Sequence, residues 1–361
     1  MSRLQNFGFL SLALVFLGAG CVTFTGFSSK KPVTGPTGFY FSNDSGESWR
    51  QISVLPTAEG VKSLSGVSVY GLFDDPNDSK AMYWLSRGRG LLYSYDNGTT
   101  WQDSVAPLNT GFVYGLAIHP KDNCTLFATN GRQIFKTTDC NRSWKEMYRE
   151  GVTNRSIKML AINPFPPYEV YALSESGVLL KSLDAGISWS IDHQFKTTVQ
   201  RLAFDYNKQG LVYVATKDSG LLRSRDGGET WVSLKDKQKT FTGALQFRRF
   251  YIYPTQPEQI YWVSKYGVIV SKNAGEDWDA VSLITPPGGT AIYSFAVNPK
   301  NEKEMYYTTT AGTRSTFYKT VDGGKSWVTR KLPSSQLPVV LKVHPENPTW
   351  LYMGFTALPA Q

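Results

Sequence analysis

A single acidic residue recurs along the chain in one fixed setting, the pattern Ser/Thr-x-Asp-x-Gly-x-Ser/Thr-Trp. Carboxylates hydrolyse glycosidic bonds when two of them flank the bond, so a repeated acid invites a catalytic interpretation. Seven copies of one acid at one kind of turn cannot all be active sites, however. An Asp carboxylate at such a place accepts hydrogen bonds from backbone N–H groups two or more residues on, which closes a tight turn. We therefore interpret the following residues as structural: Asp44, Asp96, Asp139, Asp184, Asp226 and Asp322, with Asn273 in the same position of the remaining copy.

The seven copies begin 42 to 52 residues apart, and a period of this length indicates a repeat array or propeller. Two copies are degenerate, since Asn141 replaces Gly in one and Asp277 replaces Ser/Thr in another. Asn is the next best residue after Gly for the left-handed conformation that we expect at this position. Between copies, short apolar and aromatic strands alternate with Pro-, Asn- and Asp-rich loops, so each unit is expected to have four strands.

The two ends of the chain determine the predicted number of units. The first copy is preceded by one strand only, residues 38–41, whereas the last is followed by two strands, residues 339–345 and 350–355. Joined, these pieces and the strand that follows the first copy make one four-stranded unit. The sequence therefore predicts an all-β fold: a seven-bladed β-propeller with four-stranded antiparallel blades, closed by pairing the C-terminal strands with the N-terminal strand. Closure also leaves no sheet edge exposed.

The first 38 residues differ in composition from the rest of the chain. Arg3 precedes an apolar run at residues 7–17, which is too short to span a bilayer, so we predict a signal peptide at residues 1–20. Gly18-Ala19-Gly20-Cys21 resembles a bacterial lipobox, which implies that Cys21 carries lipid, although ordinary signal cleavage stays open. Residues 21–38 are then a tether and residues 39–361 a single propeller. We expect an exported, membrane-anchored bacterial lipoprotein that faces the periplasm or the cell exterior.

The repeated eight-residue pattern resembles the Asp-box, or bacterial neuraminidase repeat, superfamily over residues 39–355. That superfamily includes sialidases, two-propeller xyloglucanases, sortilin-type receptors and photosystem II assembly and stability factors. Seven blades are most similar to the last group and to one half of a xyloglucanase. The Phe/Tyr-Arg-Ile-Pro motif of sialidases does not occur in the sequence, nor does the Cys-rich tail of the ten-bladed sortilin-type receptors. The Gly-Trp-x-x-Gly motifs usual in photosystem II factors are also not found.

The resemblance implies that any chemistry occurs at the central mouth, on the face opposite the repeated turns. The acids that we place on the loops of that face are Glu59, Glu150, Glu175, Asp192, Asp218 and Asp236. Hydrolysis of a glycosidic bond needs two carboxylates roughly 5 to 10 Å apart, but the sequence identifies no pair among these six. A surface glycoside hydrolase, of xyloglucanase or sialidase type, is therefore the alternative to a binding function.

Basic residues outnumber acids on the predicted mouth face, in a chain of formal net charge +9. We predict that this face binds its partner through Arg87, Arg89, Arg132, Arg155, Lys237, Arg248, Arg249, Lys265 and Arg314. Arginine suits bidentate contacts with carboxylate or phosphate. The sequence thus favours a binding scaffold that docks an anionic protein, glycan or surface polymer, rather than an enzyme. We expect a monomeric domain with no cofactor and no specific nucleic-acid partner. We also expect no metal site, because only three histidines and no Cys-x-x-Cys motif occur.

If Cys21 carries lipid, Cys124 and Cys140 remain as an even pair in an oxidising compartment, and we predict a disulfide between them. Cys124 begins the second strand of its blade and Cys140 lies in the turn after the third, so both fall at the same end of one sheet. The closed loop is short, and the bond should contribute about 3 kcal/mol to stability. Thiol counting on the denatured, unreduced protein is expected to find neither cysteine free, and two reactive thiols would refute the pairing.

Overall fold

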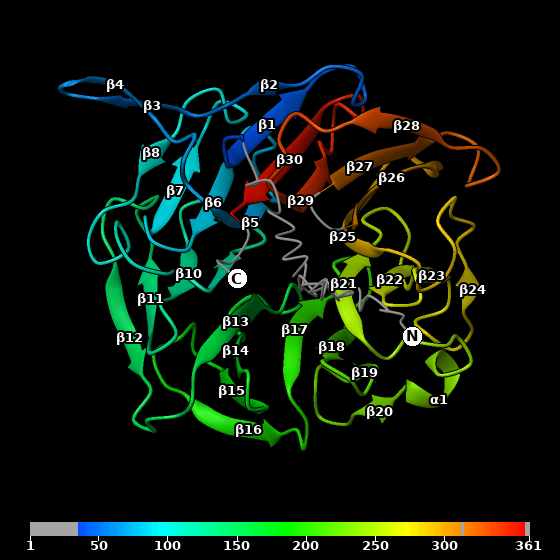
Figure 1. The fold of residues 1–361 in the computed structure, drawn as a ribbon. Helices are drawn as coiled ribbons and strands as arrows, with labels where there is room; N and C mark the ends of the chain where they lie inside the picture. The colour runs from blue at the N-terminus through cyan, green and yellow to red at the C-terminus, as the bar shows by residue number, and fades with distance from the viewer. Residues whose placement is uncertain (1–34, 312–313, 358–361) are drawn as a thin grey trace, which may run out of the picture. The chain divides into compact units, whose positions relative to one another are not determined.

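The computed structural model describes residues 35–311 and 314–357. The propeller in this range is built from seven four-stranded antiparallel sheets arranged around a common centre (Figure 1). The predicted all-β, seven-bladed fold is therefore confirmed. The predicted signal peptide, Cys21 and most of the tether lie outside the described residues. Within the described ranges, no helix is both long enough and apolar enough to cross a membrane.

Six of the blades consist of four consecutive strands, of which the first is innermost and the fourth outermost. Blades one to three comprise β5 (Val69–Asp74), β6 (Met82–Ser86), β7 (Leu91–Ser94), β8 (Gln102–Asp103); β9 (Gly115–Ile118), β10 (Leu126–Thr129), β11 (Gln133–Thr137), β12 (Lys145–Arg149); and β13 (Ile157–Ile162), β14 (Val170–Ser174), β15 (Val178–Ser182), β16 (Ser190–Gln194). Blades four to six comprise β17 (Val199–Phe204), β18 (Val212–Thr216), β19 (Leu221–Ser224), β20 (Val232–Ser233); β21 (Phe247–Ile252), β22 (Ile260–Ser264), β23 (Val268–Ser271), β24 (Asp279–Ala280); and β25 (Ala291–Asn298), β26 (Asn301–Ala311), β27 (Arg314–Thr320), β28 (Val328–Lys331).

The seventh blade joins the two ends of the chain. Its strand order is β29 (Leu337–Val343), β30 (Leu351–Thr356), β1 (Gly38–Ser42) and β2 (Arg50–Gln51). β1 and β30 are antiparallel, with Gly38 opposite Phe355 and Ser42 opposite Leu351. Ring closure by the two chain ends is thereby confirmed, because strands from both ends complete the seventh four-stranded sheet.

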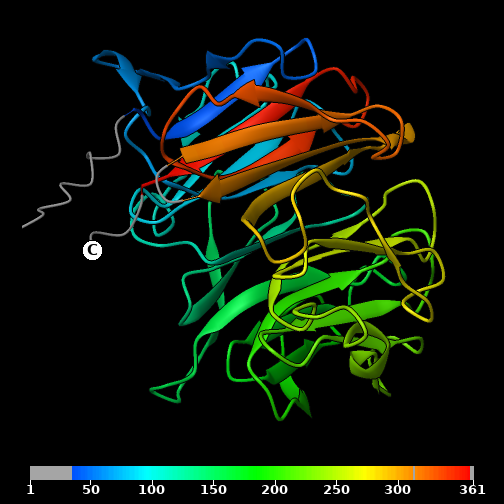
Figure 2. The same ribbon diagram turned by 45° about the vertical axis from the view of Figure 1, so that its right-hand side comes forward.

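Two connections between blades contain elements that we did not predict from the sequence. The hairpin of β3 (Val54–Thr57) and β4 (Gly60–Ser63) projects from the ring between blades seven and one (Figures 1 and 2). The one-turn helix α1 (Lys235–Gln238) lies between blades four and five. Gln238 is fully buried there, and its Oε1 accepts a hydrogen bond of 2.8 Å from the backbone N–H of Leu221.

The second strands pack between neighbouring blades and are therefore apolar on both faces. β6, β14, β18 and β22 are buried along their whole length. Trp84 and Trp262 lie in such strands with no exposed surface, so they contribute to packing between blades. The first-to-second and third-to-fourth strand connections lie at one end of every blade, which we call the box end. The other connections lie at the opposite end, which we call the mouth end.

Each repeated turn at the box end is closed by its acidic residue. In the turn Ser224–Trp231, Asp226 Oδ1 accepts hydrogen bonds from Ser224 Oγ (2.6 Å) and from the backbone N–H of Thr230 (2.9 Å). The hydroxyl of Thr230 donates to the other carboxylate oxygen. The Ser224 and Thr230 hydrogen bonds lower the pKa of Asp226 to about 2. Because these oxygens are all used within the turn, the carboxylate is structural.

In five of the seven turns, packing also requires the glycine. At Gly186 φ is +88°, and an added Cβ would lie 2.5 Å from the ring of Phe127 in blade two. The residue before the glycine is left-handed as well, as Ala185 shows with φ of +57°. We expected one left-handed residue per turn, whereas the structure has two in succession. A non-glycine residue pays for this conformation with about 1–2 kcal/mol of steric strain.

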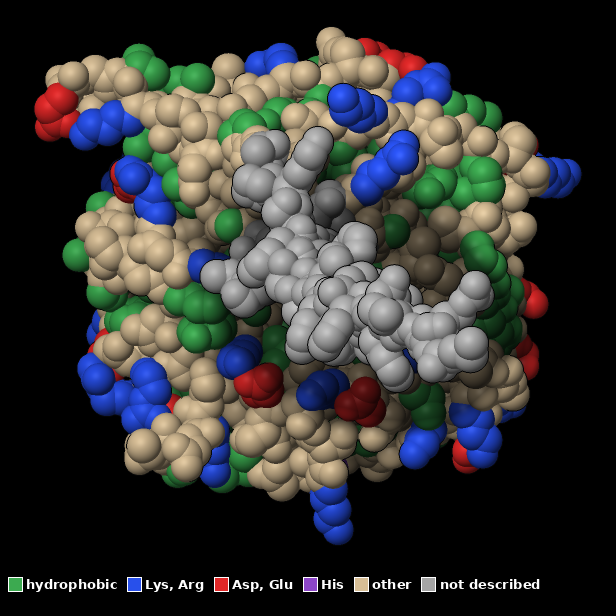
Figure 3. Space-filling model, in the orientation of Figure 1, with side chains coloured by type: hydrophobic (Ala, Val, Ile, Leu, Met, Phe, Trp, Pro, Cys, Tyr) green, Lys and Arg blue, Asp and Glu red, His purple; other side chains and the backbone are tan. Residues whose placement is uncertain are grey.

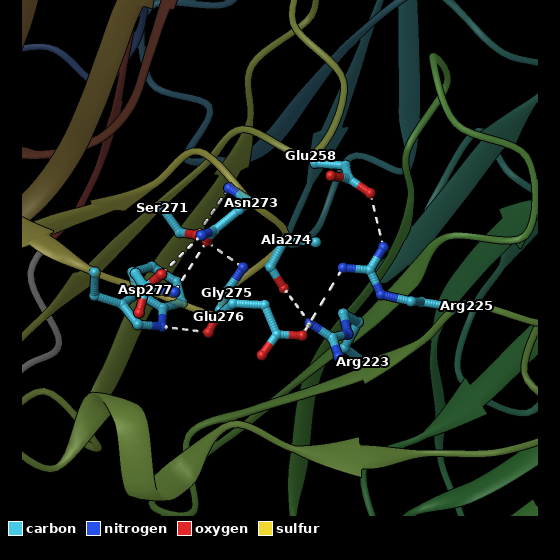
Figure 4. A network of polar contacts seen from close by, with 10 residues as sticks. Arg223, Arg225, Glu258, Ser271, Asn273, Ala274, Gly275, Glu276 and Asp277 are labelled. Carbon is cyan, nitrogen blue, oxygen red and sulfur yellow. Dashed lines mark hydrogen bonds and ion pairs between the residues drawn. The ribbon is translucent and has the colours of Figure 1, made fainter.

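In the degenerate turn Ser271–Trp278, an amide–carboxylate hydrogen bond replaces the hydroxyl–carboxylate hydrogen bond of the common turn (Figure 4). Asn273 Oδ1 accepts from the backbone N–H of Asp277 (2.9 Å), as the Asp does in other copies, while Asn273 Nδ2 donates to Asp277 Oδ2 (3.0 Å). The donor and the acceptor of this side-chain hydrogen bond are thus exchanged relative to the common turn. The turn also contacts blade four, because Arg223 Nη1 donates to Ala274 O (3.0 Å) and pairs with Glu276 Oε1 (2.6 Å).

The two cysteines predicted to pair lie together at the box end of blade two. The structure joins Cys124, just before β10, to Cys140, in the turn after β11. Their Cα atoms are 3.8 Å apart. This bond links the first-to-second connection of the blade to its repeated turn.

The exchanged pair in blade five can be tested by reversing it. Asn273→Asp should place two carboxylates in contact and lower the free energy of unfolding by about 1–2 kcal/mol at neutral pH. This loss should shrink as the pH falls towards 4, because protonation of one carboxyl removes the repulsion and restores a donor. Adding Asp277→Thr regenerates the common turn and should restore the stability, as measured by urea unfolding. Equal stability of the single variant and the parent would contradict the exchange.

Candidate functional site

The innermost strands carry a β-bulge at the same level, near the mouth end, in six of the seven blades. A bulge adds one residue to a strand and redirects its side chain. The added residues are Tyr70, Lys158, Gln200, Arg248, Tyr293 and Val339. Polar and aromatic side chains therefore gather around the centre of the mouth end, although the inner strands are otherwise largely apolar.

Tyr70 lies at the centre of a group of cations contributed by different blades. Burial raises the pKa of the Tyr70 hydroxyl, and the positive charges of Lys158, Arg87 and Arg249 oppose that rise. Arg201 also acts electrostatically on Tyr70. We call Tyr70, Arg87, Lys158, Arg201 and Arg249 the mouth cluster. Among the described residues only one carboxylate pairs with a cation of this cluster, that of Glu175 with Lys158.

Arg249 connects three blades at the mouth end. From β21, its Nε donates to Tyr293 O in β25 (3.1 Å) and its Nη2 donates to Val339 O in β29 (2.6 Å). Burial, followed by the positive charge of Arg201, lowers the pKa of Arg249 to about 10. Arg249 therefore remains charged at neutral pH, but the neighbouring positive charges disfavour this state.

Three aromatic rings lie beside the cations. Phe112 and Tyr114 stack with their centroids 3.9 Å apart, and Tyr70 meets Phe112 edge-on at 4.8 Å. Arg87 lies over the rings of Tyr70 (5.7 Å) and Phe112 (5.8 Å), and Lys158 lies over Tyr114 (5.5 Å). We call these rings the aromatic triad. Each ring is only partly buried, so the triad offers apolar surface bordered by cations.

The basic residues predicted from the sequence divide into central and peripheral ones. Arg87 and Arg249 belong to the mouth cluster, and Arg248 lies over the ring of Tyr293 at 5.6 Å. Arg89 instead forms a bidentate pair with Asp103, Arg132 donates to two backbone carbonyls, and Arg155 pairs with Glu150. Lys237, Lys265 and Arg314 are exposed at the mouth ends of different blades, where Arg314 is the first residue of β27. Figure 3 shows Lys and Arg side chains spread around the visible face, several of them beside Asp or Glu.

Most of the predicted mouth-face acids are paired with basic residues in the described chain. Four of them form ion pairs, since Glu59 pairs with Lys62, Glu150 with Arg155, Glu175 with Lys158 and Asp236 with Lys239. Our placement of Asp192 on a mouth-end loop was wrong. It lies within the outer strand β16, near Lys181 and near Glu229 of the next repeated turn, because that strand extends to Gln194. Asp218 is exposed on the β18–β19 connection.

Sequence reasoning missed Tyr70, Lys158 and Arg201, together with the aromatic triad. For Tyr70 and Lys158 the signal is positional, since the bulged residue directly follows the first buried residue of the inner strand. Aligning the seven units on the repeated turn would have revealed it. In the described part of the chain, no group of three or more His, Cys, Asp or Glu side chains could hold a metal ion.

A family model described as "Sortilin, neurotensin receptor 3" (Sortilin-Vps10) matches residues 37–160 and 266–357 of this chain, which is more than half of it. The chain belongs to the Sortilin-Vps10 family. The sequence predicts seven blades rather than the ten of sortilin-type receptors, and this Sortilin-Vps10 member has seven. The repeated turns and blade strands that the model matches are common to propellers with different numbers of blades.

Curated relatives of this Sortilin-Vps10 member include several xyloglucanases. The xyloglucanase of Hypocrea jecorina is 24% identical over 261 residues, which cover 59% of this chain and 31% of the relative. The xyloglucanase of a Paenibacillus species is 27% identical over 238 residues, which cover 54% of this chain and 23% of the relative. Vacuolar protein sorting/targeting protein 10 of Schizosaccharomyces japonicus is 31% identical over 99 residues, covering 27% and 7%. The chain thus spans about a third or less of these relatives.

Solved structures of similar fold include a GH74 xyloglucanase and YCF48. The GH74 xyloglucanase of Xanthomonas campestris matches with a TM-score of 0.62 and 16% identity, over 86% of this chain and 52% of that one. YCF48 of Cyanidioschyzon merolae matches with a TM-score of 0.60 and 13% identity, over 80% and 95%. A structure of YCF48 bound to D1 peptide matches with a TM-score of 0.59 and 14% identity, over 82% and 94%. At these identities the likeness shows the fold.

The bridging role of Arg249 can be separated from general charge effects by comparing it with its neighbour. Arg249→Met removes two charge-assisted hydrogen bonds to partly buried carbonyls and should cost about 1–3 kcal/mol of stability. Arg248→Met makes the same chemical change at an exposed position and should remain within about 0.5 kcal/mol of the parent. Chemical denaturation of both variants measures the difference. Equal stabilities would mean that the carbonyl contacts of Arg249 do not hold the blades together.

Proposed function

We propose that this protein binds a polysaccharide at its mouth end, and that the polymer carries acidic groups. One observation carries the proposal. The mouth cluster places four cations around Tyr70 with a single paired carboxylate in the described chain, directly beside the aromatic triad. Aromatic rings provide apolar surface on which sugar rings can pack, while Arg and Lys side chains bind carboxylates. An acidic glycan combines both features in one ligand.

The relatives support a carbohydrate over an anionic protein as the ligand. Several curated relatives are named xyloglucanases, and GH74 structures share the fold. The chain spans only part of those enzymes, so their activity does not transfer as a whole. The structure of YCF48 bound to D1 peptide supports the alternative of a peptide ligand. We further propose that the domain is exported and held at a membrane by lipid on Cys21.

Hydrolysis of the bound polymer is a second candidate function, favoured by the xyloglucanase relatives. It would require two carboxylates about 5–10 Å apart across the bond. We assign Glu175 and Asp218 to this role, because they occupy equivalent mouth-end connections in the adjoining blades three and four. Glu175 would then have to exchange its pairing with Lys158 for a contact with substrate. The assay for products below distinguishes a hydrolase from a binding protein.

The proposal is tested by measuring affinity for a matched pair of polymers, polygalacturonate and neutral xyloglucan, by calorimetry. The acidic polymer should bind more tightly, and its affinity should fall as salt rises from roughly 0.05 to 0.5 M because the Debye length shortens. Arg87→Gln with Arg201→Gln should weaken binding at least about tenfold. The control Lys121→Gln with Lys208→Gln removes the same charge from exposed positions of the box end and should change nothing. Binding that survives the first pair of changes would place the ligand elsewhere.

The same incubations report on hydrolysis through the release of reducing ends. A hydrolase of the assigned type loses this release in Glu175→Gln and in Asp218→Asn, whereas Glu59→Gln on the projecting hairpin retains it. Binding without products from either polymer would leave recognition alone as the function. Tight, salt-independent binding of xyloglucan, with none of polygalacturonate, would contradict the acidic-polymer proposal while keeping a carbohydrate ligand.

A further inference from the structure

A hollow with a basic lining opens at the mouth end of blade six. It has a volume of about 570 Å³ and lies between β27, β28 and the connection that follows β28. Its lining contains three Lys or Arg residues, five Ser or Thr residues and one Leu, and it includes no Asp or Glu. None of these residues belongs to the mouth cluster. We call it the blade-six groove.

Two of the three cations in the groove are available to a ligand. Arg330 is already paired with Glu47 in the repeated turn of blade seven, at 2.8 Å. Arg314 and Lys331 are exposed, and neither forms an ion pair with another residue in the part of the chain that the structure describes. The groove therefore has two uncompensated positive charges.

The strand register directs these charges to the same side of the sheet. Thr316 in β27 lies opposite Lys331 in β28, and Arg314 precedes Thr316 by two residues. Side chains two apart in a strand share a face, and directly opposite residues have Cβ atoms about 4.5–5.5 Å apart. Thr329 lies on the same face, because it precedes Lys331 by two residues in β28. Two cations and two hydroxyl groups thus converge on one surface.

We propose that the blade-six groove binds a phosphate or sulfate group. The planar guanidinium of Arg314 can bind two oxygens of a tetrahedral anion, while Lys331 contributes a point charge and the threonine hydroxyls donate hydrogen bonds. Cations held near one another without a counterion repel, and an oxyanion between them removes that cost. This site is independent of the polysaccharide proposed for the mouth cluster.

The anion can come from a soluble phosphate or sulfate, or from a phospholipid headgroup. The groove borders the place where the N-terminal segment enters the propeller, because Ser334 Oγ donates to Pro36 O (2.7 Å) and Gln336 Nε2 donates to Gly35 O (3.2 Å). Lipid on Cys21 would hold a membrane within 14 residues of Gly35, a reach of at most about 50 Å. The two sources share the same chemistry and differ in the probe that detects them.

The test uses inorganic phosphate and sulfate in calorimetry, and phosphatidylcholine vesicles with and without phosphatidylglycerol in a sedimentation assay. Arg314→Gln with Lys331→Gln should weaken binding of the soluble anions at least about tenfold. Arg314→Lys should lose part of the affinity, because it keeps the charge but not the bidentate geometry. The control is again Lys121→Gln with Lys208→Gln. All of these positions are exposed, so melting temperatures should match the parent.

Each outcome decides the proposal. Soluble anion binding that depends on Arg314 and Lys331 supports it with a free anion as ligand. Binding only to vesicles that contain phosphatidylglycerol, lost in the groove variant and kept in the control, supports it with a lipid headgroup as ligand. Binding that is equal in the groove variant and the parent, or no binding to any of these probes, overturns it. Because the mouth-cluster residues are unchanged, polygalacturonate binding should be the same in every groove variant.

Discussion

The antiparallel ladder between β1 and β30 is the interaction on which the arrangement of the molecule depends. It places residues near the two ends of the chain in one sheet and so fixes the positions of all seven inner strands around the centre. Within this ring, Arg249 of blade five donates to carbonyls in blades six and seven. The mouth cluster likewise draws its members from blades one, three, four and five. The candidate site is therefore a property of the closed ring rather than of any single blade.

The two ends of the blades differ in how their charged side chains are satisfied. At the box end, the carboxylate of Asp226 is satisfied by hydroxyl and backbone donors of its own turn, which lowers its pKa to about 2. This stabilisation is fully present above the pKa of an unfolded Asp, near 4, and is lost as the pH falls towards 2. At the mouth end the cations of the cluster outnumber the carboxylates that pair with them in the described chain. Unsatisfied charge is thus concentrated where a ligand can reach it.

The sequence predicted the parts of the structure that depend on local chemistry repeated along the chain. The turn pattern, its period and the unequal ends were sufficient for the number of blades and for the strands that close the ring. The β3–β4 hairpin and α1 have no such repeat, and both lie in connections whose conformation tertiary contacts determine, as the burial of Gln238 shows. The bulges were missed for a related reason, because a shift of one residue in strand pairing is decided by the partner strand. Among the predicted cations, Arg87 belongs to the mouth cluster. Arg89, which lies just before β7, is instead paired with Asp103 of the neighbouring strand β8.

The electrostatics of the mouth end distinguish between the ligands that the fold permits. A neutral polymer gains nothing from a cluster of cations, and keeping them together has a cost, since Arg201 contributes to lowering the pKa of Arg249 to about 10. Structural needs account for part of this charge, because Arg249 holds two backbone carbonyls and Lys158 pairs with Glu175. They do not account for Arg87 and Arg201, which form no ion pair in the described chain and are exposed. An anionic group seated beside the aromatic triad would offset this repulsion, and this is the physical reason for proposing an acidic ligand at the mouth end.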